Sequence, residues 1–247
     1  MATRHLTRKQ LSRSKIELYL DCPRCFYDEV MLGIARPSGP PFTLNIAVDA
    51  LFKAEFDAYR LMRKPHPLFA TVGLDAVPMQ HPQLEAWRTN FTGIRWKDPE
   101  TDWTFFGAVD DLWVRPNGAV VVADYKATAK AEAITPQNIF SGYKRQLEMY
   151  QFLVEKAGFT VDARAWLVYA NGIKTAAAFD DALRFHTSMI AVDCDRSWVE
   201  GKFREAVALL ANGTRPAASA ECKWCEYVVR KSVNDPEGAA GPPTISK

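Results

Sequence analysis

The sequence predicts an α/β protein in which helices flank a mixed central β-sheet. The run Val120-Val121-Val122-Ala123 is short, apolar and β-branched, and it follows the turn signal Asn117-Gly118, a pattern typical of a hairpin that leads into a buried strand. An apolar stripe with three- and four-residue steps runs from Thr43 to Met62 and predicts a long amphipathic helix. The order of helix, strands, helix, strands and helix along the chain fits one domain with a mixed sheet.

The first half of the chain is predicted to be helical and then to form strands. Ser14 is expected to cap a short first helix, and a Pro/Gly-rich connection at residues 36–41 precedes the long helix. Residues 64–82 hold four prolines and predict an irregular link. Successive antiparallel strands are expected at residues 93–96, 103–114 and 119–124.

The second half is predicted to return to helices around another pair of strands. Pro136 suits the first turn of a helix that runs to about Ala157, and Gly158 should end it. Two further strands are expected at residues 161–170 and 182–192, with Asn171-Gly172 starting the turn between them.

The last predicted helix covers Ser197 to Leu210. After Cys225 the apolar content falls, so we expect a single domain over residues 1–231 and a flexible tail over residues 232–247.

Composition excludes several classes of protein. The chain has 247 residues, of which 48% are apolar, enough for a sizeable core. The formal net charge is only +2, so global charge does not indicate a nucleic-acid binder. No apolar run is long enough to span a membrane, and the basic N-terminus has no apolar segment typical of a secretory signal. We therefore expect a cytoplasmic protein.

The segment Asp124-Tyr125-Lys126 carries the most informative chemistry. Side chains alternate along a strand, so Asp124 and Lys126 should point the same way. Asp110 closes the preceding predicted strand and can supply a second carboxylate. Two carboxylates can hold a hard divalent cation, and a lysine can orient water or neutralise developing charge, which suits phosphodiester cleavage. The alternative is an ordinary surface ion pair at the end of a strand.

Flanking motifs make this set resemble a known family. Gly107-Ala108-Val109-Asp110 precedes the central tripeptide, and Gln146 to Tyr150 follows it on the next predicted helix. The ordered set resembles the PD-(D/E)XK nuclease superfamily and, within it, the RecB-like branch. The resemblance implies a restriction-endonuclease-like core, with Asp110, Asp124 and the carbonyl of Tyr125 as ligands for Mg²⁺ or Mn²⁺. It implies that Lys126 positions the attacking water.

The resemblance extends to other site residues. Many members place a histidine on the helix before the sheet, and Asp49 occupies that place here. Asp49 could complete the shell of oxygen ligands, or it could be a solvated helix residue. Gln146 and Tyr150 are four residues apart on one helix face and are implied to steer the substrate strand, although they could also be a partly buried pair. Phosphate contacts are expected from basic residues nearby, which are Lys130, Lys144 and Arg145.

Four of the five cysteines form two pairs, Cys22-x-x-Cys25 and Cys222-x-x-Cys225, at opposite ends of the sequence. Two such pairs are the usual signature of a four-thiolate metal site, which would join the chain ends. Zinc and an iron–sulfur cluster both use four cysteines. A cytoplasmic location disfavours disulfides.

The family resemblance favours the cluster. Nucleases of the AddB type and of CRISPR adaptation carry a 4Fe–4S cluster, with one N-terminal and three C-terminal cysteines. This chain has two at each end, and that departure keeps zinc as an alternative.

These observations together predict a metal-dependent deoxyribonuclease that acts as an exonuclease or processes ends and single strands. DNA is the expected partner. A helicase or CRISPR-adaptation partner would be a separate chain, because no phosphate-binding loop of the helicase type is present. The alternative is a subunit that binds nucleic acid or supports assembly without cutting, with the same fold held together by zinc.

Overall fold

The computed structural model describes residues 8–234 of the chain, and every structural statement below concerns these residues. A five-stranded mixed sheet lies at the centre, in the order β2 (Val77–Pro78), β5 (Asp111–Val114), β6 (Val120–Thr128), β7 (Arg164–Gly172) and β8 (Phe185–Asp193). Strands β6 and β7 are parallel, and the other neighbours are antiparallel. The predicted mixed α/β fold is therefore confirmed.

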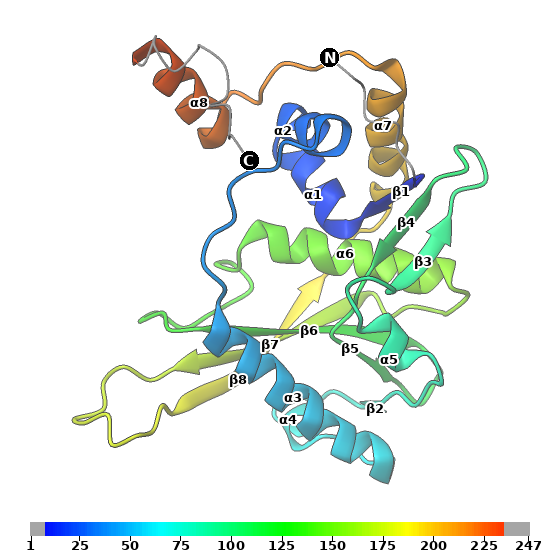
Figure 1. Cartoon of the computed structure of the whole chain (residues 1–247). Helices are drawn as coiled ribbons and strands as arrows, with labels where there is room; N and C mark the ends of the chain where they lie inside the picture. The colour runs from blue at the N-terminus through cyan, green and yellow to red at the C-terminus, as the bar shows by residue number, and fades with distance from the viewer. Residues whose placement is uncertain (1–7, 235–247) are drawn as a thin grey trace, which may run out of the picture.

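Two long helices cover the two faces of this sheet, α6 (Ser141–Lys156) on one and α3 (Thr43–Met62) on the other (Figure 1). Side chains along β6 point alternately to the two faces of the sheet, and this explains why both faces are covered by helices. Val120 and Val122 belong to the core cluster that includes α6, whereas Val121 and Ala123 belong to the cluster that includes Phe52 of α3. The two faces of β6 therefore pack into two different hydrophobic clusters.

A second, smaller sheet lies beside the first. Its order is β1 (Gln10–Ser12), β4 (Thr104–Gly107) and β3 (Ile94–Lys97). Strand β1 pairs in parallel with β4, so the N-terminal segment is held against the middle of the chain.

The prediction of one strand over residues 103–114 is wrong. The chain leaves the small sheet after Gly107 and joins the large sheet at Asp111, and the N–H of Val109 between them donates to the carbonyl of Trp87 at 3.1 Å. The apolar alternation continues across this break, so the sequence pattern did not show that the segment contributes to two sheets. Because of the break, Asp110 lies in a bend and is not paired within a sheet.

Other element boundaries also differ from prediction. Ser12, not Ser14, is the N-cap residue of α1 (Arg13–Asp21). The link at residues 64–82 contains α4 (Pro67–Ala70) and β2, and α5 (Leu84–Trp87) follows it.

Helix α6 begins at Ser141 instead of near Pro136. The side chain of Asn138 bonds to the N–H of Thr135 and the carbonyl of Ala133, and this local turn competes with a helix. The predicted turn at Asn171-Gly172 is wrong as well, because strand pairing continues to Gly172 and Phe185.

The first and last described helices lie on the α6 side of the molecule (Figure 1). Helix α1, the short α2 (Pro23–Tyr27) and a turn of π-helix at Asp28–Leu32 pack near α7 (Val199–Asn212), and α8 (Lys223–Asn234) stands beyond them (Figure 1). Helix α8 continues three residues past position 231. The rest of the predicted tail, residues 235–247, lies outside the described residues. Among the described helices none is long and apolar enough to cross a membrane.

Candidate active site and four-cysteine site

The candidate active site forms where β6 extends beyond the end of its neighbour β5. The pairing between them ends at Asp111 and Ala123, so from Asp124 onward β6 is paired only with β7. Asp110, in the bend before β5, lies beside this free edge and accepts the backbone N–H of Tyr125 at its Oδ2, at 3.0 Å. The carboxylate thus satisfies a backbone donor that the sheet leaves unpaired.

Asp124 is fully buried on the face of β6 that α6 covers. Its Oδ1 accepts a hydrogen bond from the amide of Gln146 at 2.8 Å. Burial raises the pKa of Asp124 to about 7, and the nearby charge of Asp110 adds to the increase, while Lys126 opposes it. A carboxyl in this position gains from a cation, which would restore its charged form.

Lys126 lies on the same face, as predicted, and its ammonium forms an ion pair with Oδ2 of Asp124. The ammonium also lies 3.5 Å from the carbonyl oxygen of Tyr125 and 4.9 Å from the centre of the Tyr143 ring. Burial works to lower the pKa of Lys126, but Asp124 and Asp110 outweigh it, so the pKa is raised and the lysine stays protonated.

The predicted pair Gln146 and Tyr150 is in contact. The Gln146 amide donates to the Tyr150 hydroxyl at 3.0 Å as well as to Asp124, so it links the helix to the buried carboxylate. Gly107 permits this close packing, because a Cβ there would come within 3.0 Å of the Tyr150 ring and 3.2 Å of Leu153. The glycine of the motif therefore serves the approach of α6 to the small sheet.

Asp49 approaches from the opposite side of the sheet, on α3. Its Oδ2 lies 2.8 Å from the ammonium of Lys53, one helical turn further on. The same ammonium lies 3.5 Å from Oδ1 of Asp110. Asp49, Lys53 and Asp110 thus form a chain of charges that reaches the free edge of β6.

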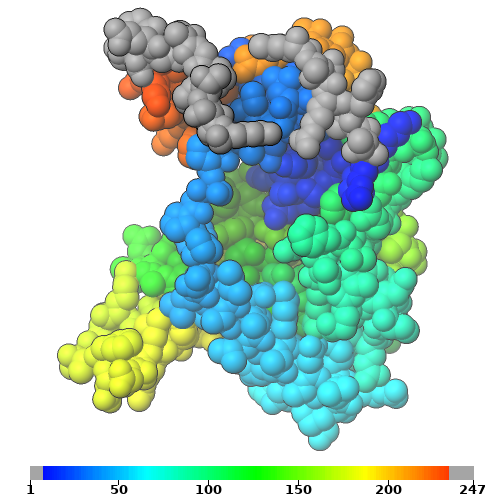
Figure 2. Space-filling view, in the orientation of Figure 1, coloured from blue at the N-terminus to red at the C-terminus, as the bar shows by residue number. Residues whose placement is uncertain are grey.

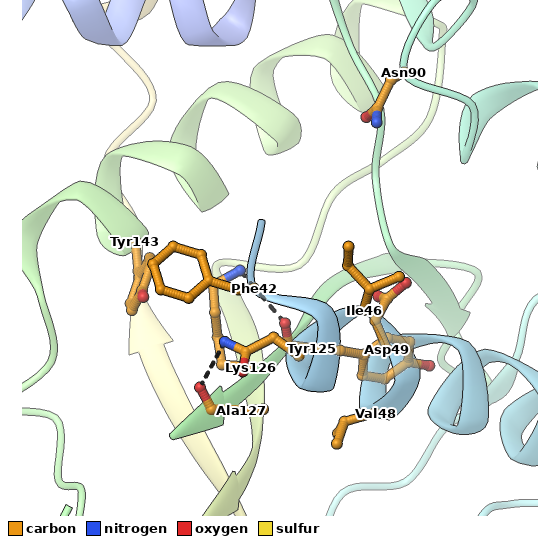
Figure 3. A pocket seen from close by; sticks show the side chains of 10 residues that line it. Phe42, Ile46, Val48, Asp49, Asn90, Tyr125, Lys126, Ala127 and Tyr143 are labelled. Carbon is orange, nitrogen blue, oxygen red and sulfur yellow. Dashed lines mark hydrogen bonds between the residues drawn. The ribbon is translucent and has the colours of Figure 1, made fainter. Parts of the chain in front are cut away.

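A pocket of about 610 Å³ is lined by Asp49, Tyr125 and Lys126 of this site. In Figure 3, the labelled side chains of Phe42, Tyr143 and Lys126 lie toward one side of the pocket and Asp49 of α3 toward the other. In Figure 2 the green atoms of the middle of the chain are recessed between the blue N-terminal segments and the cyan helix below. The side chains of Phe42 and Ile46 line the pocket although they are mostly exposed.

The predicted basic residues do not converge on this pocket. Arg145 and Lys144 are one and two residues before Gln146 and so lie on other faces of α6. Arg145 forms an ion pair with Glu17 of α1, with 3.1 Å between Nε and Oε1. Lys144 lies 3.9 Å from Glu148. Lys130 is exposed just beyond β6, where its carbonyl accepts a hydrogen bond from Asn171.

The neighbouring Asp111 has a structural role. It is completely buried and accepts hydrogen bonds from Arg88 at 2.9 Å, from the Trp113 indole at 3.0 Å and from the Tyr125 hydroxyl at 2.8 Å. Arg60 of α3 forms a further ion pair with it. This network anchors α3 and the ring of Tyr125 to the sheet, and it keeps Asp111 away from the pocket.

The two cysteine pairs converge, and all four Sγ atoms lie within 4.8 Å of one another. The Sγ–Sγ distances are 3.9 Å for Cys22 and Cys225, 3.6 Å for Cys25 and Cys222, and 3.6 Å for Cys25 and Cys225. Four thiolates at 2.3 Å around one tetrahedral ion would be separated by about 3.8 Å. A four-iron cluster attaches each cysteine to a different iron and so needs wider spacing.

One guanidinium and two backbone donors lie beside these four thiols. Arg36 donates to the Sγ of Cys222 at 3.3 Å and also pairs with Asp21. Burial raises the pKa of Cys25, whereas at Cys22 hydrogen bonds from the backbone of Cys25 and Ser219 overcome burial and lower the pKa to about 6. All five cysteines are free, and Cys194 lies apart, with its thiol directed at the carbonyl of Val192.

Sequence reasoning missed three residues at these two sites. Lys53 carried a usable signal, because a lysine four residues after Asp49 shares its helix face. Tyr143 carried a similar one, three residues before Gln146. Arg36 carried none, because its contact with Cys222 joins positions 186 residues apart.

Comparison with known proteins gives the following relationships. A sequence model of the PD-(D/E)XK nuclease superfamily matches residues 45–230. No curated protein matches the sequence.

Two solved structures resemble the fold at low identity. The crystal structure of SSO0001 is 15% identical, with a TM-score of 0.42, and the match covers 90% of this chain and 84% of that one. An alkaline exonuclease from Laribacter hongkongensis is 11% identical, with a TM-score of 0.41, and the match covers 92% and 94%.

Proposed function

Because this chain belongs to the PD-(D/E)XK nuclease superfamily, we propose that it is a divalent-metal-dependent deoxyribonuclease. One observation carries the proposal, namely that Asp110, Asp124 and Lys126 meet at the free edge of β6. The three residues come from two different segments, and a merely structural ion pair would not need the third group.

The donor set fits a hard cation such as Mg²⁺ or Mn²⁺. Asp110 and Asp124 offer carboxylate oxygens, Tyr125 offers its carbonyl, and Asp49 offers a further carboxylate from α3. Such a cation polarises the scissile phosphate and lowers the pKa of a bound water.

The protein residues supply the rest of the chemistry. The Lys126 ammonium, held by Asp124 and facing the pocket, orients the attacking water and offsets negative charge on the phosphate in the transition state. Gln146 fixes the orientation of Asp124 through its amide. We assign Gln146 and Tyr150 to positioning this carboxylate, in addition to the steering of the strand that the family resemblance implies.

The pocket suggests how a strand would be held. Phe42 and Tyr143 offer aromatic faces next to Lys126, and such faces stack on unpaired bases. This arrangement favours single strands or DNA ends over an intact duplex, which fits an exonuclease. Lys130 lies beyond the end of β6 and is the better placed of the predicted phosphate contacts, whereas Arg145 is held by Glu17. Any helicase or CRISPR-adaptation partner would act as a separate chain.

The proposal is tested with labelled single- and double-stranded DNA in Mg²⁺, in Mn²⁺ and in EDTA. Lys126→Ala should lower the cleavage rate by about 10²–10³-fold, because it removes charge stabilisation in the transition state, while DNA binding changes little. Lys202→Ala, which alters an exposed lysine of α7 paired with Glu205, is the matched control. Cleavage by Lys126→Ala at the wild-type rate would show that the site is wrongly assigned.

The rival function is a subunit that binds nucleic acid without cutting it. The replacement of the usual histidine by Asp49 favours it. In that case the wild-type protein would bind single-stranded DNA but leave it intact at all concentrations of Mg²⁺ and Mn²⁺.

For the four-cysteine site we propose a single tetrahedral Zn²⁺ that joins α2 to the start of α8. Three Sγ–Sγ distances of 3.6–3.9 Å, with all four Sγ atoms within 4.8 Å of one another, support one ion over the 4Fe–4S cluster that the family resemblance favours. Protein purified without oxygen should be colourless and contain one zinc per chain. A brown protein with about four irons and a broad visible absorption would refute the zinc assignment.

A further inference from the structure

Lys53 is a second lysine at the candidate active site, and neither the motif nor the family comparison assigns it a role. It projects from α3 toward the free edge of β6, and its side chain is only 25% exposed. Its ammonium lies 2.8 Å from Oδ2 of Asp49 and 3.5 Å from Oδ1 of Asp110. One ammonium group thus bridges a carboxylate of α3 and a carboxylate in the bend before β5.

In nucleases with two metals, a pair of divalent cations stabilises the attacking and leaving oxygens of the phosphate. Lys53 is a positive charge held between two carboxylates, which are the ligands that such a cation would use. Asp49 is set by the helix and Asp110 by its bond to the N–H of Tyr125, so both are held in place. The remaining oxygens are Oδ1 of Asp49 and Oδ2 of Asp110, and the latter already accepts the Tyr125 N–H. Each carboxylate therefore has little capacity for a second cation while Lys53 is present.

The charge count leads to the same conclusion. Asp49, Asp110 and Asp124 contribute three negative charges, and Lys53 and Lys126 contribute two positive ones. One divalent ion then leaves the site slightly positive, which suits a phosphodiester. Two ions would make it strongly positive before the substrate arrives, at a cost in ion affinity.

We propose that the Lys53 ammonium takes the place of a second divalent cation between Asp49 and Asp110, so that the active site binds one Mn²⁺ or Mg²⁺. This inference rests on the proposed nuclease function. Lys53 then holds Asp49 and Asp110 in position for the phosphate, and each active site binds one divalent ion.

The test counts Mn²⁺ ions by electron paramagnetic resonance and calorimetry, on protein whose cysteine site is already loaded. Wild type and Lys53→Arg should each bind one Mn²⁺ at the active site, because both retain a cation at this position. Lys53→Met, which keeps the chain length and removes the charge, should bind two. The double variant Lys53→Met with Asp49→Asn should bind one again, because the second ion needs the Asp49 carboxylate.

Two results would overturn the inference, namely two Mn²⁺ ions in the wild type, or a single ion in Lys53→Met. Melting temperatures of the variants distinguish these results from misfolding, since a folded Lys53→Met protein with one ion counts against the inference. Failure of the proposed function has a different signature, because the wild type would then leave single-stranded DNA intact in Mn²⁺, whatever number of ions each variant binds.

Discussion

The backbone N–H of Tyr125 donates to Oδ2 of Asp110 at 3.0 Å. This bond satisfies a backbone donor of β6 at the point where β5 stops pairing with it. The same carboxylate is a proposed metal ligand. A structural and a chemical role therefore fall on one side chain, and different substitutions can separate them.

Asp110→Asn should fold normally and lose Mn²⁺ binding, because an amide oxygen still accepts the Tyr125 N–H but carries no charge. Asp110→Ala should lose Mn²⁺ binding and also about 1 kcal/mol of unfolding free energy, since the backbone donor then has no partner in the protein. Urea denaturation and Mn²⁺ titration of the two variants check this. Equal stability of the two variants would mean that the bond to Tyr125 contributes nothing to folding.

Gln146 should affect cleavage through Asp124. Gln146→Ala leaves Oδ1 of a buried carboxylate without its donor, and we expect a 10–100-fold lower cleavage rate and about 1–3 kcal/mol less stability. Tyr150→Phe removes only the other acceptor of the same amide and should cost much less in both measurements. The prediction fails if Tyr150→Phe is as impaired in cleavage as Gln146→Ala.

Local pattern was a good guide to some elements of the fold. The apolar stripe predicted the helix at Thr43–Met62 with the bounds that the structure has, because a helix that long has a clear period. The strand predicted at residues 103–114 failed, because alternation reports which face is buried and not which sheet receives the strand.

Local sequence pattern likewise predicted only part of the candidate site. Motif spacing brought together Asp110, Asp124, Lys126 and Gln146, because neighbouring strands and the following helix are short steps along the chain. The phosphate contact at Arg145 stays a prediction, but the sequence did not indicate its pairing with Glu17, because Glu17 lies 128 residues away and only the packing of α1 on α6 brings the two together. Contacts of this kind depend on tertiary structure and leave no local signal.

His66 should make stability depend on mildly acidic pH. It is buried under α3, where it stacks on Phe56 at 4.0 Å and its Nδ1 accepts the N–H of Leu68 at 3.2 Å. Burial lowers its pKa, although Glu55 opposes the change. The unfolded chain, with a pKa of about 6.5, then binds the proton more readily.

The contribution of His66 is therefore complete above pH 6.5 and is lost as the pH falls through the lowered pKa of the folded state. Urea denaturation at pH 7.5 and pH 5.5 should show this loss in the wild type. His66→Asn, whose amide oxygen can still accept the Leu68 N–H, should show a much smaller change. A loss of the same size in His66→Asn would assign the effect to other groups.

The four-cysteine site should behave as one unit in folding. Cys22 and Cys25 lie near the N-terminal end and Cys222 and Cys225 near the C-terminal end, so one ion joins segments about 200 residues apart. Part of its binding free energy is therefore folding free energy.

Each single Cys→Ser variant at these four positions should lose the ion and melt at a lower temperature, by about 2–4 °C for each kcal/mol lost in a chain of this size. Cys194→Ser is the control, because its thiol lies apart from the four-cysteine group, where it donates to the Val192 carbonyl, and its loss should leave the metal content unchanged. Metal analysis together with thermal melting makes the comparison, and a variant that keeps its full complement of metal after losing one of the four thiols would exclude that cysteine as a ligand.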